Sequence, residues 1–346
     1  MNIAFLGFNS FLVHKRGVEN VIDFQSKATN FEKIYYLHLG ERNSAYRYKH
    51  FICISVKKNI YWPLYLNLIL FRLKSKKKVK IHSHTPLLSF AYLGITDILT
   101  VHDALFYQSK ALKSRFVEIF FLIEKLVYLK VKIVHFISHF SKSNSLFPNK
   151  NKNFEIIYNT SSFEEFFPLS LSEEQHSSAN IKKVLCVRSI EERARFDLLI
   201  EVAEKLPDFD FTVAGKGPLL EKFRGITKAR NLNNLVFLGY VSDNSLLDLY
   251  RLTDLVLVLA EYGEGFGLPI IEGYLFNKPV VASNVCAIPE VINDKFFLTA
   301  NTVEDICGKL LSIEKYKPSA YRNYYENKFS NKLIMNKFSA LYKRIF

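Results

Sequence analysis

Residues 255–283 read LVLVLAEYGEGFGLPIIEGYLFNKPVVAS, and this stretch decides the fold class. Its apolar runs Leu255–Ala260 and Pro279–Ser283 show no alternation with polar side chains, which is typical of strands buried on both faces. Between them, Pro269 suits the first turn of a helix, where a missing N–H costs nothing. A strand, a helix and a second strand in this order form a βαβ unit, and such units build parallel sheets covered by helices.

Apolar runs of the same kind recur along the whole chain and alternate with longer stretches of helical character. In the first half they are Asn2–Phe8, Lys33–Leu39, Phe51–Val56, Val79–His82, Asp97–His102, Lys132–Ser138 and Phe154–Tyr158. In the second half they are Lys183–Val187, Phe209–Ala214, Leu235–Gly239, Leu255–Ala260, Pro279–Ser283 and Phe296–Ala300. The sequence therefore predicts an α/β protein with two doubly wound, Rossmann-like domains.

A polar, serine-rich segment separates the two series of runs. Residues 169–180 are predicted to be a linker, which places one domain at 1–168 and the other at 181–329. Aromatic and aliphatic residues at helical spacing predict that a C-terminal helix, residues 330–346, packs back on the first domain. In open parallel sheets, ligands bind beyond the carboxyl ends of the strands, so we expect a ligand in a cleft between the domains.

The composition excludes several protein classes. With 49% apolar and 23% charged residues among 346, the chain is neither disordered nor a coiled coil. We expect no transmembrane helix, because every apolar stretch is shorter than the ~18 residues required, and no signal peptide. The four cysteines lie far apart without metal or redox spacing, and we expect buried, reduced thiols of a cytoplasmic protein.

Positive charge is concentrated in the first half of the chain. Residues 1–165 hold 24 Lys and Arg against 11 Asp and Glu, whereas the remainder holds 23 against 22. Such an excess indicates an anionic partner. We do not expect a nucleic acid, because the sequence has no helix-turn-helix, zinc pattern or aromatic ribonucleoprotein motif.

Two segments combine basic residues with apolar and aromatic ones. The stretch Ile60–Phe71 runs directly into a basic cluster, and residues 113–132 repeat the pattern. The cluster consists of Arg72, Lys74, Lys76, Lys77, Lys78 and Lys80. This mixture is typical of an interfacial anchor and favours an anionic membrane surface as the partner. The alternative is a core helix followed by a solvated, lysine-rich loop, and the pattern leaves both open.

The turn ahead of the helix predicted after Ala260 has the features of a binding site. Glycines permit close backbone approach, so Gly265–Leu268 can direct free N–H groups at an anion. Glu264 lies in this turn, and Glu272 lies about two helical turns further along. The alternative is a glycine-containing turn followed by a surface glutamate.

This pattern resembles a known family. Glu264 and Glu272, in the setting E-G-F-G-L-P-x-x-E, match the E-x7-E signature of the family 4 retaining glycosyltransferases of the GT-B fold. Further segments that resemble the family's motifs, in order, are Arg16–Glu19, His82–Pro86, Thr100–Asp103, Phe136–Ser138, Ile157–Asn159, Ala214–Leu219, Phe237–Tyr240 and Lys278–Ser283. The resemblance covers nearly the whole chain and implies the GT-B architecture. Within the family, the chain resembles bacterial surface-polysaccharide glycosyltransferases.

The family's functional residues carry over to single positions of this chain. The resemblance implies that the catalytic residues are Glu264, which contacts the hydroxyls of the donor sugar, and His102, which lies beside the reacting carbon. The implied substrate-binding residues are Gly17, Arg188, Arg193, Arg195, Tyr240, Gly265, Phe266, Gly267, Leu268 and Glu272. Among these, Gly17 would line the diphosphate, Tyr240 would border the nucleobase and Glu272 would contact the ribose.

The segment that clamps the donor diphosphate departs from the family pattern. The usual form is G-R-x4-K-G, but here Arg188 occupies the position of the usual glycine and Ala194 that of the usual lysine. On another alignment, Arg188 and Arg193 reproduce the R-x4-K spacing, and Arg195 adds a third guanidinium. A bidentate guanidinium can replace an ammonium at a diphosphate, and the sequence leaves open which arginine does so.

The resemblance implies a retaining, metal-independent transferase that moves a hexosyl unit from a UDP- or GDP-linked sugar to a saccharide acceptor. No cofactor besides this donor substrate is expected. The basic first half favours a lipid-linked acceptor in lipopolysaccharide, O-antigen or capsule assembly, and a cytoplasmic enzyme peripheral to the inner face of the membrane. The altered diphosphate clamp leaves an alternative: a non-catalytic relic of the fold, or a partner subunit, that keeps a nucleotide pocket.

Overall fold

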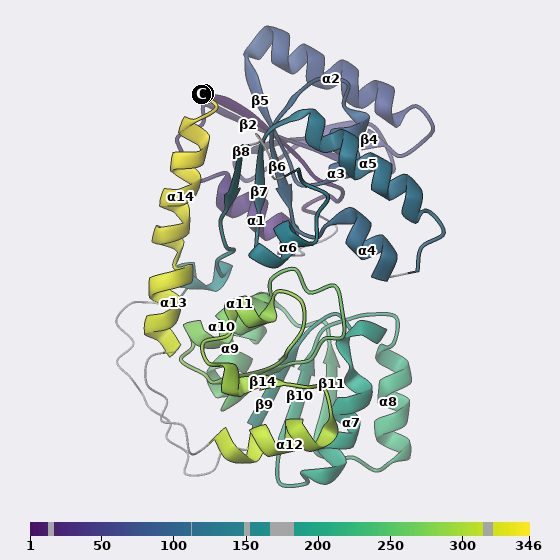
Figure 1. Ribbon diagram of the computed structural model, residues 1–346, viewed down its shortest axis with the longest axis vertical. Coiled ribbons are helices and arrows are strands. Elements are labelled where there is room, and N and C mark those ends of the chain that lie inside the picture. The colour runs from purple at the N-terminus through teal and green to yellow at the C-terminus, as the bar shows by residue number, and fades with distance from the viewer. Residues whose placement is uncertain (13–16, 112, 149–152, 167–182, 314–320) are drawn as a thin grey trace. The chain divides into compact units, whose positions relative to one another are not determined.

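The computed structural model describes residues 1–12, 17–111, 113–148, 153–166, 183–313 and 321–346. The chain forms two compact units, and each is described by itself (Figure 1). Unit 1 consists of Met1–Asn159 and Lys332–Phe346, and unit 2 of Thr160–Asn331. The segment predicted as a linker, 169–180, lies outside the described residues.

The first unit ends before residue 168, the limit expected from the sequence. The 3₁₀ helix η1 (Ser162–Phe166) belongs to unit 2 because one of its carboxylates is bound there. Glu164 Oε2 accepts hydrogen bonds from Tyr325 Oη and from the backbone N–H of Asn331, both at 2.7 Å.

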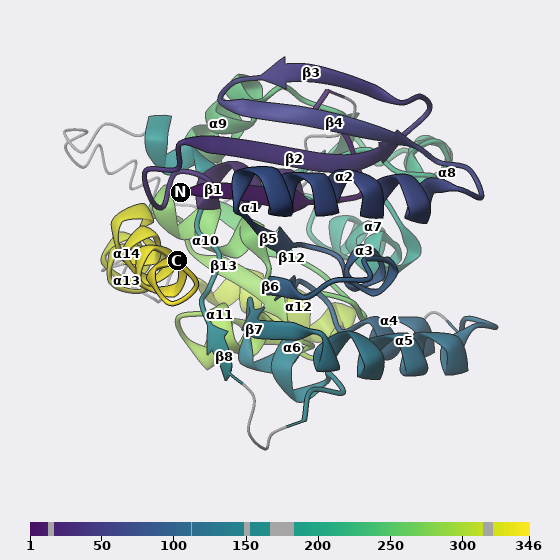
Figure 2. The same cartoon turned by 90° about the horizontal axis from the view of Figure 1, so that it is seen from above.

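Unit 1 contains an eight-stranded sheet with the order β3-β4-β2-β1-β5-β6-β7-β8, which Figure 2 shows from one edge to the other. The strands are β1 (Asn2–Leu6), β2 (Lys33–Gly40), β3 (Ser44–Tyr48), β4 (Phe51–Lys57), β5 (Val79–Ser83), β6 (Thr96–Val101), β7 (Val131–Phe136) and β8 (Asn153–Ile156). Only β3 pairs in the antiparallel direction, with β4. The predicted parallel sheet is therefore confirmed, with one antiparallel edge strand that the sequence analysis missed.

Helices cover both faces of this sheet, which explains why most of its strands are continuous apolar runs. The helices are α1 (Gly17–Gln25), α2 (Trp62–Lys77), α3 (Pro86–Ala91), α4 (Leu105–Ala111), α5 (Val117–Leu129), α6 (His139–Ser143) and α14 (Asn331–Lys343). In β1, Ile3 and Phe5 share a core with α1 and α14, whereas Ala4 and Leu6 share another with α2 and α3. Figure 1 shows α14 alongside this sheet, although it follows unit 2 in the chain.

Unit 2 contains a six-stranded parallel sheet with the order β11-β10-β9-β12-β13-β14. The strands are β9 (Lys183–Val187), β10 (Asp210–Ala214), β11 (Leu235–Gly239), β12 (Leu255–Val258), β13 (Val280–Ser283) and β14 (Leu298–Thr299). The helices are α7 (Phe196–Lys205), α8 (Leu220–Ala229), α9 (Asp243–Leu252), α10 (Leu268–Leu275), α11 (Ile288–Val291), α12 (Val303–Ser312) and α13 (Tyr321–Phe329), with the 3₁₀ turns η2 (Glu192–Ala194) and η3 (Lys295–Phe297).

Each sheet has a point at which the strand order reverses. In unit 1, β1 lies between β2 and β5, and in unit 2, β9 lies between β10 and β12. Ligands of open parallel sheets bind at the carboxyl ends of the strands beside such a point. In unit 2, the residues directly after β9 and β12 therefore lie where a ligand is expected.

Two expectations about solubility and redox state can be compared with the described residues. No described helix combines the length and the apolar character needed to cross a membrane. Cys53, Cys186 and Cys307 are buried, free thiols, as expected. Cys286 is also free but only partly buried, because it lies in the turn after β13 rather than in an element.

Candidate active site

The loop between β12 and α10 is held in one conformation. Gly267 begins the helix in a left-handed conformation (φ 93°), and a Cβ there would lie 2.9 Å from Ile270 Cδ1. Phe266 is buried against the ring of Phe329. The carbonyl of Glu264 accepts a hydrogen bond from the backbone N–H of Ala287 at 3.2 Å. The Gly265–Leu268 segment at the start of α10 is therefore fixed from both sides.

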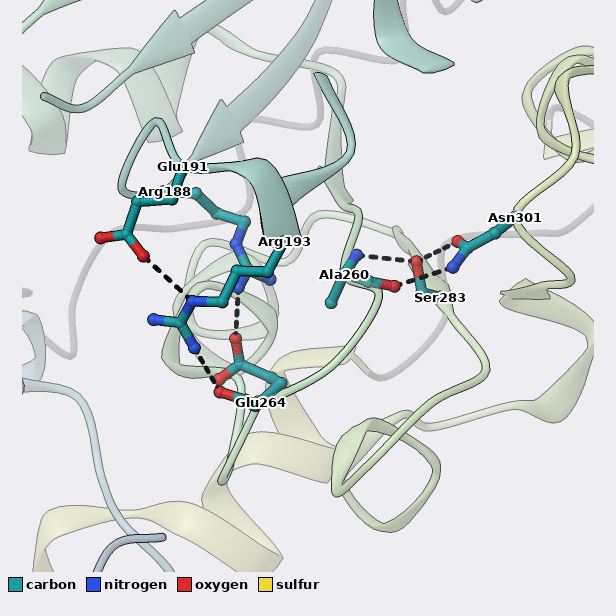
Figure 3. A network of polar contacts seen from close by, with 8 residues as sticks. Arg188, Glu191, Arg193, Ala260, Glu264, Ser283 and Asn301 are labelled. Carbon is teal, nitrogen blue, oxygen red and sulfur yellow. Dashed lines mark hydrogen bonds and ion pairs between the residues drawn. The ribbon is translucent and has the colours of Figure 1, made fainter. Parts of the chain in front are cut away.

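Glu264 forms an ion pair with Arg188, the first residue after β9. Arg188 Nη2 lies 2.9 Å from Glu264 Oε2, and the two side chains are 9% and 19% exposed (Figure 3). Arg188 Nη1 is buried and has no hydrogen-bond partner among the residues that the structure describes. Buried donors are almost always paired, so this N–H group is available to an acceptor that the described part of the chain does not supply.

The other two arginines of the predicted clamp have different partners. Arg193, in η2, donates from Nε to Glu191 Oε2 at 3.2 Å and from Nη1 to the carbonyl of Gly263. It thereby ties η2 to the loop that carries Glu264 (Figure 3). Arg195 donates in bidentate fashion to the exposed carboxylate of Asp197, from Nε to Oδ1 and from Nη2 to Oδ2. The sequence left open which arginine serves the diphosphate; Arg188 is the one that combines burial with a free donor.

Two glycines determine the position of the Arg188 backbone. A Cβ on Gly215 would lie 1.8 Å from the carbonyl oxygen of Arg188, and one on Gly217 would lie 2.2 Å from that of Ile190. The N–H of Arg188 donates to the carbonyl of Ala214 at 3.1 Å. The segment after β9 therefore packs directly against the segment after β10, which only glycine permits.

A polar clamp that the sequence analysis missed holds the end of β12. Ser283 Oγ accepts from the N–H of Ala260 at 2.9 Å and donates to Asn301 Oδ1, while Asn301 Nδ2 donates to the carbonyl of Ala260 at 2.8 Å (Figure 3). Ser283 ends β13, and Asn301 adopts a left-handed conformation (φ 61°). No local signal marks Ser283 and Asn301, because the three residues of the clamp lie at or after the ends of three different strands.

The second glutamate of the motif lies on α10. Glu272 Oε2 accepts a hydrogen bond from Tyr250 Oη at 2.7 Å, and burial raises the pKa of the carboxyl to about 7. Tyr240, the position expected to border a nucleobase, follows β11 and is 68% exposed, with Lys216 Nζ 5.5 Å from the centre of its ring. All these residues belong to unit 2.

Unit 1 carries the remaining two candidates, Gly17 and His102. Gly17 begins α1, and Arg16, which precedes it, lies outside the described residues. His102 follows β6, and its Nε2 lies 3.0 Å from Nδ1 of His84, which follows the neighbouring strand β5. Burial lowers the pKa of His102 to about 3, so its imidazole is neutral at physiological pH. His84, left unassigned by the sequence analysis, is therefore the immediate neighbour of the candidate catalytic histidine.

The arrangement in unit 2 has a counterpart among known proteins. Residues 170–330 match the family model described as "Glycosyl transferases group 1". Over this segment, the chain is similar to the glycosyltransferases of that group. The resemblance predicted from Glu264 and Glu272 is thus confirmed at the level of the family, whereas the role of each site residue stays a prediction.

Relatives of the chain come from bacteria and archaea. An "Uncharacterized 41.2 kDa protein in cps region" of Klebsiella pneumoniae is 28% identical over 207 residues, covering 56% of this chain and 56% of that protein. The "O-antigen biosynthesis glycosyltransferase WbnH" of Escherichia coli is 28% identical over 165 residues, covering 47% of this chain and 46% of that protein. The chain thus aligns with about half the length of these relatives, or less.

Solved structures share the fold over the whole chain. A sucrose-phosphate synthase from Thermosynechococcus elongatus has a TM-score of 0.81 at 16% identity, covering 100% of this chain and 99% of that one. The Anabaena protein HepE, crystallised with UDP and glucose, has a TM-score of 0.78 at 16% identity, covering 99% of this chain and 100% of that one. The predicted GT-B fold, with two Rossmann-like domains, is confirmed.

Proposed function

We propose that this chain is a retaining glycosyltransferase that moves a hexosyl unit from a UDP- or GDP-linked sugar to a saccharide acceptor. The observation that carries the proposal is the Arg188–Glu264 pair beside the strand-order reversal of unit 2, where the buried Arg188 Nη1 has no partner among the described residues. A diphosphate oxygen is the kind of acceptor that such a donor needs. The HepE structure, a complex with UDP and glucose, supports the same class of ligand.

The proposed mechanism rests on charge stabilisation and positioning. As the bond between sugar and diphosphate breaks, the guanidinium of Arg188 and the N–H groups at the start of α10 stabilise the negative charge on the departing phosphate. The carboxylate of Glu264 accepts hydrogen bonds from the sugar hydroxyls, and a departing phosphate oxygen takes the proton of the acceptor hydroxyl. Guanidinium and helix supply the positive charge, so the proposal requires no metal ion and no cofactor.

A panel of nucleotide sugars tests this proposal. The thermal stability of the protein is measured with UDP-, GDP- and ADP-linked hexoses, because a ligand at 100 times its Kd adds ~2.7 kcal/mol of stability. The matching donor is then incubated with saccharide acceptors, and the anomeric configuration of the product is read by NMR. Binding with transfer and retained configuration supports the proposal. Binding without transfer or donor hydrolysis favours the non-catalytic relic instead.

Arg188→Ala is expected to weaken the binding of the nucleoside diphosphate more than Arg193→Ala or Arg195→Ala. Contacts to charged groups contribute ~1.5–3 kcal/mol, so the loss of affinity for Arg188→Ala should be about tenfold or more. Arg195, which pairs with exposed Asp197, is the matched control. Titration calorimetry gives the three affinities, and equal affinities for all three variants and the parent would place the clamp elsewhere.

We further propose that the acceptor is a lipid-linked saccharide at an anionic membrane surface, as in the assembly of a bacterial surface polysaccharide. The name of the relative WbnH supports this class of product. Exposed apolar residues on and just before α2 support the proposed contact with a membrane. Tyr61, which precedes the helix, and Leu64 and Leu68 on its outward side are 61%, 57% and 59% exposed. On α5, Leu122 and Leu129 are 56% and 67% exposed. With the basic excess of residues 1–165, these exposed side chains suit an interface that is both apolar and anionic.

Helix α2 and the residue after α5 both contact the end of α3. Asn67 Nδ2 on α2 donates to the carbonyl of Ala91 at 2.9 Å, and Lys130 Nζ after α5 donates to that of Tyr92 at 2.6 Å. Leu93, in the loop that follows α3, is 74% exposed. The exposed apolar residues of α2, of this loop and of α5 therefore belong to neighbouring segments of unit 1.

Co-sedimentation with vesicles tests the membrane proposal. Binding should require anionic lipid, and it should weaken with salt as the screening length falls to ~3 Å at 1 M. The double variant Leu64→Ser, Leu68→Ser should bind at least several-fold more weakly, because it removes two apolar side chains from the interface. Leu311→Ser is the matched control, since Leu311 is 59% exposed on α12 of unit 2. Equal recovery with neutral and anionic vesicles would contradict this proposal.

A further inference from the structure

Unit 1 has a lysine-lined groove where strands β1, β2 and β5 begin. The groove holds about 810 Å³, and six lysines line it: Lys33, Lys74, Lys76, Lys77, Lys78 and Lys80. Figure 2 marks both chain ends near this part of the sheet, and Met1 and Phe346 line the groove as well. His84 and His102 follow the opposite ends of their strands, so the groove is separate from the candidate active site of unit 1.

The charge in the groove is not balanced within the described part of the chain. The groove's lining contains one carboxylate side chain, that of Glu32, and none of the six lysines forms an ion pair with a described carboxylate. Elsewhere in the unit a lysine beside a buried acid is paired: Lys132 Nζ lies 2.7 Å from Asp97 Oδ1. Like charges gathered around one space repel one another, so an anion that enters the groove should stabilise the unit.

The local fold gathers these lysines from separate segments. Lys74, Lys76 and Lys77 lie in the last turn of α2, and Lys78 ends the helix in a left-handed conformation (φ 49°) that turns the chain into β5. Asn2 Nδ2, from the start of β1, donates to the carbonyl of Lys77 at 2.9 Å and so ties this turn to the sheet.

Three of the ammonium groups lie beside aromatic side chains, and that of Lys74 is 5.9 Å from the centre of the Tyr92 ring. Lys77 Nζ lies 3.1 Å from Tyr35 Oη, and Lys80 Nζ lies 5.9 Å from the centre of the Phe346 ring. The carbonyl-bearing end of α2 also favours cations in its last turn. The groove is therefore built from several elements rather than from one solvated run of lysines.

We propose that this groove binds a ligand with two or more adjacent phosphate groups, either the headgroup of a lipid or a soluble phosphorylated compound. An ammonium group is a compact point charge that contacts phosphate oxygens from many directions, so several lysines suit a phosphate chain better than a planar carboxylate. A volume of about 810 Å³ accommodates such a ligand without displacement of the sheet. The site is distinct from the donor site proposed in unit 2 and does not depend on it.

Titration calorimetry with inorganic tripolyphosphate at constant ionic strength tests the proposal. The titrations use the full chain carrying Arg188→Ala, which weakens the contribution of the proposed donor site. In this background, Lys76→Gln, Lys78→Gln and Lys80→Gln together should reduce the affinity at least tenfold. The matched control, Lys57→Gln, Lys58→Gln and Lys113→Gln, removes the same charge from elsewhere in unit 1 and should change it less than threefold. Equal losses of affinity in both triple variants would overturn the proposal. So would a chain with an intact groove that binds neither tripolyphosphate nor vesicles with cardiolipin.

Vesicles distinguish the two sources of phosphate. If the ligand is a lipid headgroup, vesicles with cardiolipin, which has two phosphates, should bind the chain more tightly than phosphatidylglycerol vesicles of equal charge. The groove variant should lose this preference, while the Leu64→Ser, Leu68→Ser variant keeps it at weaker overall binding. If the ligand is soluble, tripolyphosphate binds through the groove and cardiolipin gives no preference. A cardiolipin preference that survives in the groove variant would overturn the assignment to a lipid headgroup.

Discussion

Glu264→Gln is expected to lower transfer by about 100-fold or more, the size of effect seen when a preorganised charge-stabilising group is removed from an active site. In the proposed mechanism, the carboxylate orients the sugar hydroxyls and pairs with Arg188 across 2.9 Å. The amide of glutamine keeps one oxygen as an acceptor for Arg188 but loses the charge. Turnover with the matched donor, measured under single-turnover conditions, gives the effect on the chemical step.

A change of stability must be separated from the change of rate. Arg188 is 9% exposed, so an unpaired guanidinium would also destabilise unit 2. Urea unfolding of the same variant measures this contribution directly. Glu261→Gln is the matched control, because Glu261 lies exposed in the same loop. If Glu264→Gln keeps most of its turnover, the proposed role of the motif is wrong.

Unit 1 is expected to lose stability steeply as the pH falls below about 6.5, the ordinary pKa of histidine. It buries His82, His84 and His135, with His102 partly buried beside them. Burial lowers the pKa of all four, to about 3 for His102 and about 4 for His135. Hydrogen bonds connect His82, through Thr100 Oγ1, to His135 Nδ1 at 2.7 and 2.9 Å.

The sign follows from the direction of these shifts. A histidine with a lowered pKa stays neutral in the folded chain. Its contribution to the free energy of unfolding is therefore complete above pH ~6.5 and is lost below that pH, as the unfolded chain takes up protons. Between pH 6.5 and 5, this amounts to about 2 kcal/mol per fully buried histidine. Unit 2 contains a group with the opposite effect on stability. Because the pKa of Glu272 is raised to about 7, its contribution to the free energy of unfolding grows as the pH falls from 7 toward 4.5.

The single tryptophan makes this prediction measurable. Trp62 packs against the core of unit 1, so its fluorescence reports the unfolding of that unit. The urea concentration at the midpoint of unfolding of unit 1 should be lower at pH 5 than at pH 7. His135→Gln should make this decrease smaller, because one titrating group is missing. His139→Gln, at an exposed position, should leave the fall unchanged. The same midpoint for the parent at both pH values would contradict the prediction.

The strands of both sheets could be predicted because most of them are continuous apolar runs. The exception, β3, reads Ser44-Ala-Tyr-Arg-Tyr48 and alternates between exposed and partly buried positions. It lies at the edge of the sheet, where one face meets solvent, so an analysis based on unbroken apolarity passes over it. The end of unit 1 was also placed too late, because the contacts of Glu164 with Tyr325 join segments far apart in the sequence.

The motif of the candidate site could be found from spacing, but its partners could not. Glu264 and Glu272 belong to one local segment, which a sequence shows directly. The pairing of Glu264 with Arg188 depends on β9 and β12 being neighbours in the sheet, which follows from the strand order and not from separation along the chain. The Ser283–Asn301 clamp was missed for the same reason.

The position of α14 has a consequence for the synthesis of the protein. Ile334, Phe338 and Leu341 fill the core beside β1, yet the ribosome adds them only after all of unit 2 has been made. Domains that fold during translation usually fold from the N-terminus onward. Here we expect the reverse order: unit 2 can complete its core first, while nascent unit 1 keeps an apolar face uncovered until α14 emerges.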